Sequence, residues 1–594
     1  GIDVSDAERM VTDKGEWLLH KAQVAGQPVE TLLTGILNQA VSKLPIPKPM
    51  RWGDYSTQFI RPVHTVCVMY GHEVMPVELL GKQSSPTILG HRFHGDASFE
   101  LAHADQYAES LKQHYVVADY QARVDVIQEQ LEKQASDLGL KADYDQSLLE
   151  EIASLVEWPV VLKATFEEKF LDVPKEALIY TMKDDQKYVP LLNTDGELSN
   201  TFLFVTNIES SDPSQIIGGN ERVIRPRLAD AEFFYNTDKK ATLESRLESL
   251  ESVLFQKQLG TLKAKSERIA ALSAFIAGQT GADQTLAERA GLLAKADLMS
   301  QMVMEFPDVQ GTMGKYYAQH DGEHAEVAQA LHDQYLPRFA GDSVPRSLVS
   351  ASVSLADKFD TLVGIFGIGQ LPKGDKDPFA LRRAAIGVLR IITECDLALD
   401  LDLVAQHAVT VYGDKLTNDQ TKEQVVDFIL NRFVALLSDQ GISTDVIQAV
   451  SARRPTRPTD YLARIHAVAA FKQREEAEAL AAANKRVANI LSKQNIQIDA
   501  DLTVNPALLE EPAEVALYKS LNSASDSVYK DISSFDYNAV LTTLSALRGD
   551  IDAFFDNVMV MADDDTLRNN RLALLLLLRQ LFLTTAEISL LAKS

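Results

Sequence analysis

The sequence has few cysteines, no long apolar run and no excess of positive charge. Its two cysteines, Cys67 and Cys395, cannot build a metal cluster by themselves, and so low a number is typical of a reducing compartment. The longest apolar run near the C-terminus, residues 572–578, ends at Arg579 and is far shorter than the roughly 20 residues that span a bilayer. No secretory signal is visible. We therefore expect a cytoplasmic protein that does not associate with membranes.

The net charge of −26 excludes one simple way of binding nucleic acid. An acidic surface repels phosphate, so diffuse and nonspecific binding is disfavoured. A specific RNA partner remains possible if it meets localised basic patches. At 594 residues and 46% hydrophobic content, the chain is a folded protein of several domains.

Hydrophobic periodicity changes along the chain. Residues 1–45 have a helical pattern that ends in a proline-rich linker. Period-two patterns then predict a hairpin from residues 63–70 and 74–80, with its turn at Gly71. Two further buried strands are predicted at residues 160–162 and 202–206. Beyond about residue 240, sustained 3.6-residue periodicity predicts helices almost throughout.

A glycine-rich loop followed by a basic helix, residues 364–390, is the clearest candidate for contact with an anion. Gly369 and Gly374 have the first spacing of a phosphate-binding loop, but Asp375 follows where that motif needs lysine. A structural turn, or a loop that touches RNA backbone, is therefore favoured over a nucleotide-hydrolysing loop. Arg382 and Arg383 point about 100° apart on the helix, so we expect only one of them to meet RNA.

The helical region from about 265 to 390 also has the kind of helical pattern found in metal-dependent phosphohydrolases of the HD type. Such enzymes need a histidine, a His-Asp pair and a distant aspartate, for which Asp357 is suitably placed. Ala296 stands where the pair before Asp297 needs histidine, and alanine cannot bind a metal. The pairs at 320–321 and 332–333 match no ligand spacing and are interpreted as solvated helix surface. We expect an HD-like fold without metal chemistry and predict no metal ligand or catalytic residue.

Basic residues near the C-terminus are candidates for RNA contacts. Lysine, arginine and asparagine can hold phosphates and read base edges in an unstacked loop. Asp563 to Asp565 are expected to cap a leucine-rich helix. Arg571, beside the leucine run, and Asn484 have a second interpretation, in which they pin helices together by buried hydrogen bonds. The predicted contacts in the whole chain are Lys485, Arg486, Arg453, Arg454, Arg457, Arg568, Arg571, Arg382 and Arg383.

The arginines of the chain differ in how much acid surrounds them in sequence. Arg453, Arg454 and Arg457 have little acid nearby and are the better candidates. The arginines of segment 222–227 lie close to Asp230 and Glu232, so intramolecular ion pairs are at least as well supported there.

Several ordered strings resemble one family over nearly the whole chain. They are Met-Arg-Trp-Gly at 50–53, Gly-His-Arg-Phe-His at 90–94, the arginine-rich segment 219–235, Ala-Asp-Lys-Phe-Asp at 356–360, Asp-Pro-Phe-Ala-Leu-Arg-Arg at 377–383, Ala-Asn-Lys-Arg-Val-Ala-Asn-Ile at 483–490 and Asn-Arg-Leu at 570–572. These strings are similar to the β subunit of bacterial glycine–tRNA ligase. The family opens with a further segment, so we expect that roughly its first hundred residues are missing before Gly1.

The resemblance implies a tRNA-binding subunit that positions tRNA-Gly for glycylation. The signatures of an adenylation site are not found in this chain, which agrees with a family in which ATP, with Mg²⁺, is used at the α subunit. The implied assembly is an α2β2 heterotetramer, and the implied last domain is the all-helical anticodon-binding domain also found in arginine-type ligases. The alternative function, an HD-type phosphohydrolase, stays open here.

The expected fold class is multidomain α+β. Its predicted regions are a mixed helix and β-hairpin region at 1–100, an α+β region at 101–240, a helical HD-like domain at 241–400, a helical linker region at 401–475 and a helical anticodon-binding domain at 476–594. The histidines of segment 90–94 have no nucleophile nearby, so we expect them to have a structural or interface role.

Overall fold

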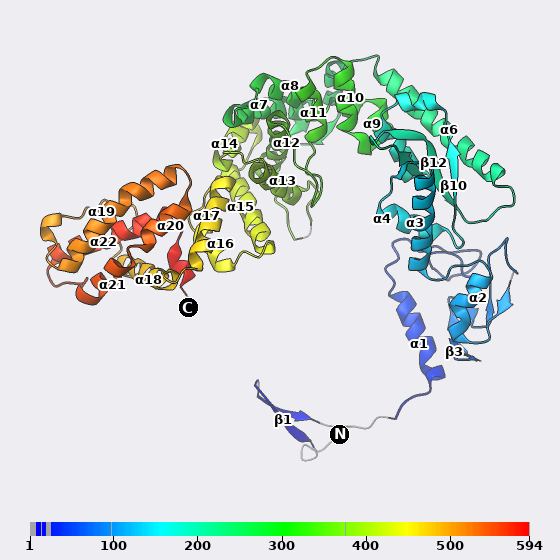
Figure 1. Ribbon diagram of the computed structural model, residues 1–594, viewed down its shortest axis with the longest axis horizontal. Helices are drawn as coiled ribbons and strands as arrows, with labels where there is room; N and C mark the ends of the chain where they lie inside the picture. Colours follow the sequence, from blue (N-terminus) through cyan, green and yellow to red (C-terminus); the bar gives the residue numbers. More distant parts are fainter. Residues whose placement is uncertain (1–6, 14, 20–24, 97, 375, 593–594) are drawn as a thin grey trace. The chain divides into compact units, whose positions relative to one another are not determined.

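The computed structural model describes residues 7–13, 15–19, 25–96, 98–374 and 376–592. The chain separates into two compact units, residues 1–232 and 233–594. The first mixes helices with short strands, and the second is almost wholly helical (Figure 1). Asp375, expected to repel a phosphate in the glycine loop, lies outside the described residues.

The first unit begins with a β-hairpin, where we expected helix. Strands β1 (Glu8–Thr12) and β2 (Gly15–Leu19) pair antiparallel, and Gly15 has a φ of 126° that suits glycine. Across the pair, Arg9 Nη1 donates to Glu16 Oε2 at 2.9 Å. The helical expectation for residues 1–45 is therefore wrong at this hairpin, whereas helix α1 (Val29–Ser42) agrees with it.

The predicted hairpin at Gly71 is confirmed, with much shorter strands than expected. Strand β3 (Met69–Tyr70) pairs with β4 (Glu73–Val74), and Gly71 has a φ of 63° in the turn. Two more small antiparallel pairs follow, β5 (Glu78–Leu79) with β6 (Lys82–Gln83) and β7 (Thr87–Ile88) with β8 (Phe99–Glu100).

A four-stranded antiparallel sheet forms the main core of the first unit. Its order is β10-β12-β11-β9, and the central strands are buried because their apolar residues meet helices α3 and α4. Both predicted buried strands are confirmed as β10 and β12, which pair along six residues from Val160↔Thr206 to Thr165↔Thr201. The elements are α2 (Tyr107–Gln113), α3 (Tyr120–Asp137), β9 (Lys141–Ala142), α4 (Gln146–Leu155), β10 (Val160–Thr165), α5 (Lys175–Tyr180), β11 (Val189–Leu192), β12 (Leu198–Thr206) and α6 (Pro213–Asp238).

The second unit begins with a small strand pair and a group of helices around the buried helix α12. Most of α12 is apolar or small on every side, which is typical of a helix enclosed by neighbours. Gly364 lets the ring of Tyr412 approach α12, because a Cβ there would clash with the tyrosine hydroxyl. The elements are β13 (Leu254–Gln256), β14 (Gly260–Thr261), α7 (Leu262–Thr280), α8 (Gln284–Leu293), α9 (Gln301–Glu305), α10 (Thr312–His320), α11 (Ala325–Asp333), α12 (Leu348–Gly367) and α13 (Leu381–Glu394).

The remainder of the second unit is helical, as predicted. Asp564 caps α22 by accepting from Thr566 N at 2.7 Å and Leu567 N at 3.1 Å, which confirms the expected aspartate cap. The helices are α14 (Leu401–Tyr412), α15 (Thr421–Asp439), α16 (Thr444–Ser451), α17 (Pro458–Lys472), α18 (Ala477–Lys493), α19 (Pro512–Ser533), α20 (Tyr537–Ser545), α21 (Arg548–Asn557) and α22 (Asp565–Leu583). In the part of the chain that the structure describes, no helix combines the length and apolarity needed to cross a membrane.

Candidate nucleic-acid interface

Helix α18 presents a basic face to solvent. Lys485 and Arg486 are both exposed, and they border a surface hollow of about 420 Å³ with Asn489 and Lys493. Because positions four residues apart share one side of a helix, Lys485, Asn489 and Lys493 form a single row. The sequence prediction missed Asn489 and Lys493, although this spacing could have found them. We call the four residues the α18 basic face.

The opposite side of α18 anchors this face to the domain. Val487 and Leu491 are buried, and Asn484 is buried with its amide donating to the Leu480 carbonyl at 3.0 Å. The Asn484 side chain therefore makes a hydrogen bond within its own helix. The guanidinium of Arg486 lies 4.2 Å from the ring centroid of Phe555, which holds the charge in place by a cation–π contact while leaving it exposed.

Arg571 lies in a buried ion pair. Its Nε donates to Glu514 Oε1, and its Nη1 donates to the Met559 carbonyl at 2.9 Å. Its side chain is 9% exposed and that of Glu514 is 0% exposed. This is the second of the two interpretations given above, in which Arg571 joins helices. Its guanidinium lies inside the domain and not at its surface.

Arg568 is committed to the start of its own helix. Its Nη1 donates to the Ala562 carbonyl at 3.0 Å, and its Nη2 contacts Asp565. The Asp565 carboxylate already pairs with the Arg568 guanidinium, so the positive charge of Arg568 is partly neutralised. The structure brings neither Arg568 nor Arg571 onto the α18 basic face.

The three arginines between α16 and α17 have different surroundings. Arg454 lies 2.8 Å from Asp427 and 3.7 Å from Asp402, and Arg457 lies 3.5 Å from Asp400. These carboxylates come from residues far away in sequence, so the expectation that Arg454 and Arg457 lack neutralising acid is wrong. Arg453 is exposed, and among the described residues its side chain has no hydrogen-bond or ion-pair partner.

Arg382 and Arg383 divide as expected for neighbours on a helix. The Nη2 of Arg382 donates to the Gly374 carbonyl, so this arginine holds the glycine loop against α13. Arg383 is exposed and lines a cavity beside α12. Asp377 caps the helix by accepting from Leu381 N and Arg382 N, both at 2.9 Å.

Two motifs of the first unit have structural contacts. Arg225 pairs with Glu167 at 2.6 Å, so the expected intramolecular ion pair exists with a different partner. His91 is buried, its Nε2 lies 2.7 Å from the Asn207 carbonyl, and its Nδ1 accepts from Phe93 N and His94 N at 3.2 Å. A loop-shaping role for the 90–94 segment follows from these contacts.

Two lysines pair with Asp357, the aspartate that the sequence places as the distant ligand of an HD-type metal site. Asp357 lies 2.8 Å from Lys265 Nζ and 2.9 Å from Lys295 Nζ. Burial opposes its ionisation, but these two charges hold the pKa of the Asp357 carboxyl well below its ordinary value. Lys265 also pairs with Asp360 at 2.9 Å. No local pattern marks this cluster in the sequence, because its two lysines lie on segments far from α12, which carries the aspartates.

Asp297, beside Ala296, is buried in a different setting. Its Oδ2 accepts from Gly311 N at 2.5 Å and from Gly314 N at 3.1 Å. Burial raises the pKa of Asp297 to about 6, although both amides and the charge of Lys295 oppose the rise. This aspartate therefore tightens the turn before α10.

The donor set does not resemble a metal site. Asp333 is buried and lies 2.8 Å from His332 Nδ1, and Asp321 accepts from Leu243 N at 2.7 Å, so these two aspartates are structural rather than solvated as we expected. Among the described residues, no group of three or more His, Cys, Asp or Glu side chains could hold a metal ion.

Comparison with known proteins identifies the family. Residues 1–452 match the model of the glycyl-tRNA synthetase beta subunit, and residues 480–588 match the model of the DALR anticodon binding domain. The glycine–tRNA ligase beta subunit of Alteromonas mediterranea is 71% identical over 594 residues, which is 100% of this chain and 86% of that protein. That of Shewanella amazonensis is 60% identical over 593 residues, with the same coverage. That of Pseudoalteromonas atlantica is 58% identical over 592 residues, covering 100% of this chain and 85% of the relative.

These matches cover both the mixed first unit and the C-terminal helices that carry the α18 basic face. They do not favour a phosphohydrolase. The chain belongs to the glycyl-tRNA synthetase beta subunit family.

Proposed function

We propose that this chain is the tRNA-binding subunit of a two-component glycine–tRNA ligase and that it holds tRNA-Gly through the α18 basic face. One observation carries the proposal. Exposed cations at Lys485, Arg486 and Lys493 line one hollow, inside the segment that matches an anticodon-binding domain, on a chain with a net charge of −26. Phosphate is drawn to such a patch because the rest of the surface repels it.

The other predicted contacts contribute unequally. Arg453 and Arg383 are exposed and have no side-chain ion pair among the described residues, so they remain candidate phosphate contacts. Arg454, Arg457, Arg568 and Arg382 would each have to exchange a present partner for RNA. Exposed ion pairs are weak, so Arg454 and Arg457 can make that exchange at small cost. Arg571 is left out because its charge is buried.

Glycylation of tRNA-Gly requires the assembly of this chain with an α subunit. The chain works in the cytoplasm with an α subunit as an α2β2 heterotetramer. ATP and Mg²⁺ are used at the α subunit, and this chain supplies no catalytic residue. Its contribution is orientation: fixing the anticodon arm restricts where the acceptor end can go, which favours acyl transfer.

The helical group around α12 is, in this proposal, an HD-like domain without metal chemistry. Its candidate ligand Asp357 is held by two lysines, and Ala296 stands in place of a histidine. An ammonium group can neutralise a carboxylate without a metal, so the domain keeps its packing and has no hydrolytic centre.

Binding of labelled tRNA-Gly to the chain, measured by fluorescence anisotropy over a salt series, tests the proposal. We expect Lys485→Ala with Arg486→Ala to weaken binding and to lower the slope of log affinity against log salt by about 1 for each cation that contacts phosphate. The matched control, Lys519→Ala with Lys530→Ala, removes two exposed lysines of α19 that do not border the hollow. Its binding should change little.

Glycylation with added α subunit gives the functional readout. The α18 double variant should raise KM for tRNA-Gly far more than it lowers kcat, because it removes binding rather than chemistry. Equal effects of the α18 and α19 double variants would contradict the proposal, since total charge rather than this face would then govern binding.

A further inference from the structure

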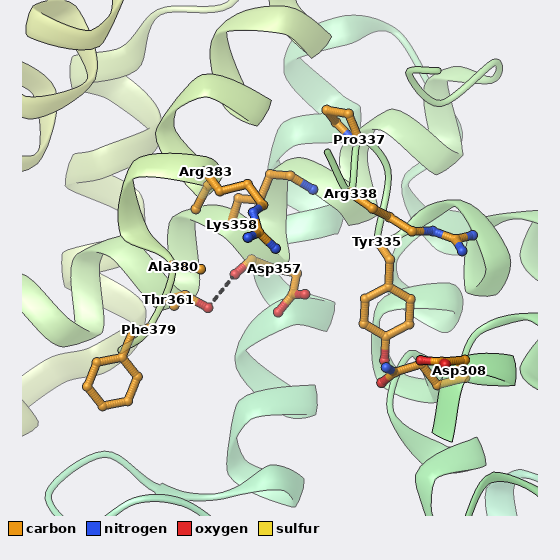
Figure 2. Close-up of a pocket in the computed structure, with 12 residues that line it drawn as sticks. Asp308, Tyr335, Pro337, Arg338, Asp357, Lys358, Thr361, Phe379, Ala380 and Arg383 are labelled. Carbon is orange, nitrogen blue, oxygen red and sulfur yellow. Dashed lines mark hydrogen bonds between the residues drawn. The ribbon is translucent and has the colours of Figure 1, made fainter. Parts of the chain in front are cut away.

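A cavity of about 580 Å³ lies beside α12, away from the α18 basic face. Its walls come from α12, from the start of α13 and from the segment between α11 and α12. Figure 2 shows Arg383 and Lys358 on one side, Tyr335 and Arg338 on the other, and Asp357 between them. Its size is that of a small-molecule site, which commonly spans about 300–1,000 Å³.

The cations of this cavity are not matched by acids. The Nζ of Lys358 donates to three neutral oxygens: the Leu336 carbonyl at 2.8 Å, Ser354 Oγ at 2.7 Å and the Gln334 carbonyl at 3.4 Å. Arg338 and Arg383 are exposed, and within the described ranges neither guanidinium has a hydrogen-bonding or ion-pairing partner. Three basic groups therefore line one cavity with no carboxylate paired to any of them, and burial lowers the pKa of the Lys358 ammonium to about 8.

The carboxylate at the centre of the cavity is already neutralised from behind. Lys265 Nζ lies 2.8 Å from one oxygen of Asp357, and Lys295 Nζ lies 2.9 Å from the other. Both lysines are buried, so they reach Asp357 from the interior and not from the cavity. An anion entering the cavity meets Asp357 with its charge largely balanced. The remaining acid of the lining, Asp308, is exposed to solvent, which screens its charge.

The backbone is built to keep this arrangement tight. A Cβ on Gly387 would lie 2.7 Å from Lys358 Cε, so a larger residue there would displace the end of that lysine side chain. Half-buried Phe379 adds an aromatic wall to the cavity, and half-buried Tyr335 lines it as well, with Lys295 Nζ 4.3 Å from its ring centroid. Aromatic faces stack on nucleobases, and arginines donate two hydrogen bonds to one phosphate.

We infer that this cavity binds a nucleotide through its phosphate. The guanidinium groups of Arg383 and Arg338 donate to the phosphate oxygens, Lys358 adds a third basic group beside them, and the base stacks on an aromatic wall. The same chemistry has two sources, a nucleotide residue of a bound tRNA or a free nucleotide. The site does not depend on the α18 basic face, and no bond is made or broken in it.

Isothermal titration calorimetry of the full chain with AMP tests the cavity directly. We expect saturable binding that Arg383→Glu weakens roughly 10- to 100-fold, the range for loss of a charged hydrogen bond. The matched control is Arg346→Glu, the same charge change at an exposed arginine that does not line the cavity. It should leave AMP affinity unchanged, and so should Lys485→Ala with Arg486→Ala.

Competition with tRNA-Gly then separates the two sources. Displacement of AMP by tRNA-Gly supports a tRNA nucleotide as the occupant, and simultaneous binding supports a free nucleotide. If AMP does not bind but Arg383→Glu weakens tRNA-Gly binding and Arg346→Glu does not, the tRNA nucleotide is again supported. If Arg383→Glu changes neither AMP binding nor tRNA binding, the inference is overturned, whatever the α18 variants do.

Discussion

Replacing Arg571 by alanine leaves the carboxylate of Glu514 buried without its cation. Glu514 is fully buried and also accepts from Glu510 N at 2.8 Å and Glu511 N at 3.0 Å, which closes the capping box at the start of α19. Removing one partner of a buried ion pair costs about 3–5 kcal/mol, because the remaining charge is left uncompensated. We therefore expect Arg571→Ala to loosen the contact between α19 and α22.

Hydrogen exchange followed by mass spectrometry measures this loss where it occurs. A multidomain chain does not unfold in one step, so a local readout is preferable to a single melting temperature. The expected loss of about 3–5 kcal/mol corresponds to exchange that is on the order of 10²–10⁴ times faster at the start of α19. The double variant Arg571→Met with Glu514→Gln should recover much of the protection, because the neutral amide oxygen can still accept from Glu510 N and Glu511 N and no buried charge is left unpaired.

Arg486→Ala is the matched control for this prediction. Arg486 is an exposed arginine of the same domain, so its removal should leave exchange in α19 unchanged while weakening tRNA binding. The opposite pattern would refute the reasoning. If Arg571→Ala left exchange unchanged and abolished tRNA binding, Arg571 would be an RNA contact and its burial would not describe the working state.

Three further variants test other parts of the second unit. Asp297→Asn should stabilise the second unit by up to about 3 kcal/mol at neutral pH, because Asp297, with its pKa raised to about 6, opposes folding once it is ionised. Calorimetry should show that this gain in stability falls as the pH drops from about 6 to about 4 and vanishes below that. Gly364→Ala should destabilise by about 1–3 kcal/mol because its Cβ meets a tyrosine hydroxyl, whereas Gly549→Ala, which meets nothing within 4 Å, should be neutral or stabilising in the same thermal assay. Asp427→Asn should free Arg454 from its 2.8 Å partner and raise the affinity for non-cognate tRNA several-fold at low salt, and unchanged affinity would show that Arg454 does not face RNA.

The features predicted from the sequence are those with a local physical cause. The apolar runs of β10 and β12 and the aspartate cap of α22 each depend on neighbours a few residues away, and the structure has both. The hairpin of β1 and β2 was not predicted because nearly all its side chains are exposed, so no alternation of buried and exposed residues marks it.

The candidate site was only partly predictable because charge balance depends on contacts between distant segments. Arg454 and Arg457 have little acid nearby in sequence, yet folding brings Asp427 and Asp400 to them. The two lysines that hold Asp357 are equally invisible, since they lie on other elements of the fold. Spacing along one helix, in contrast, would have sufficed to find the whole α18 basic face.

The acidic composition of the chain and the positions of its exposed cations together determine where phosphate is attracted. Folding pairs many arginines of this chain with acids, as at Arg225 and Arg454, and such pairs leave little positive charge for a chance polyanion. Several cations without acid partners line two hollows, that of α18 and the cavity beside α12, while others such as Arg453 lie elsewhere on the surface. Phosphate is therefore attracted at defined positions and repelled elsewhere. For a subunit that must orient one RNA, this distribution turns a net charge unfavourable to RNA into a restriction on how RNA can dock.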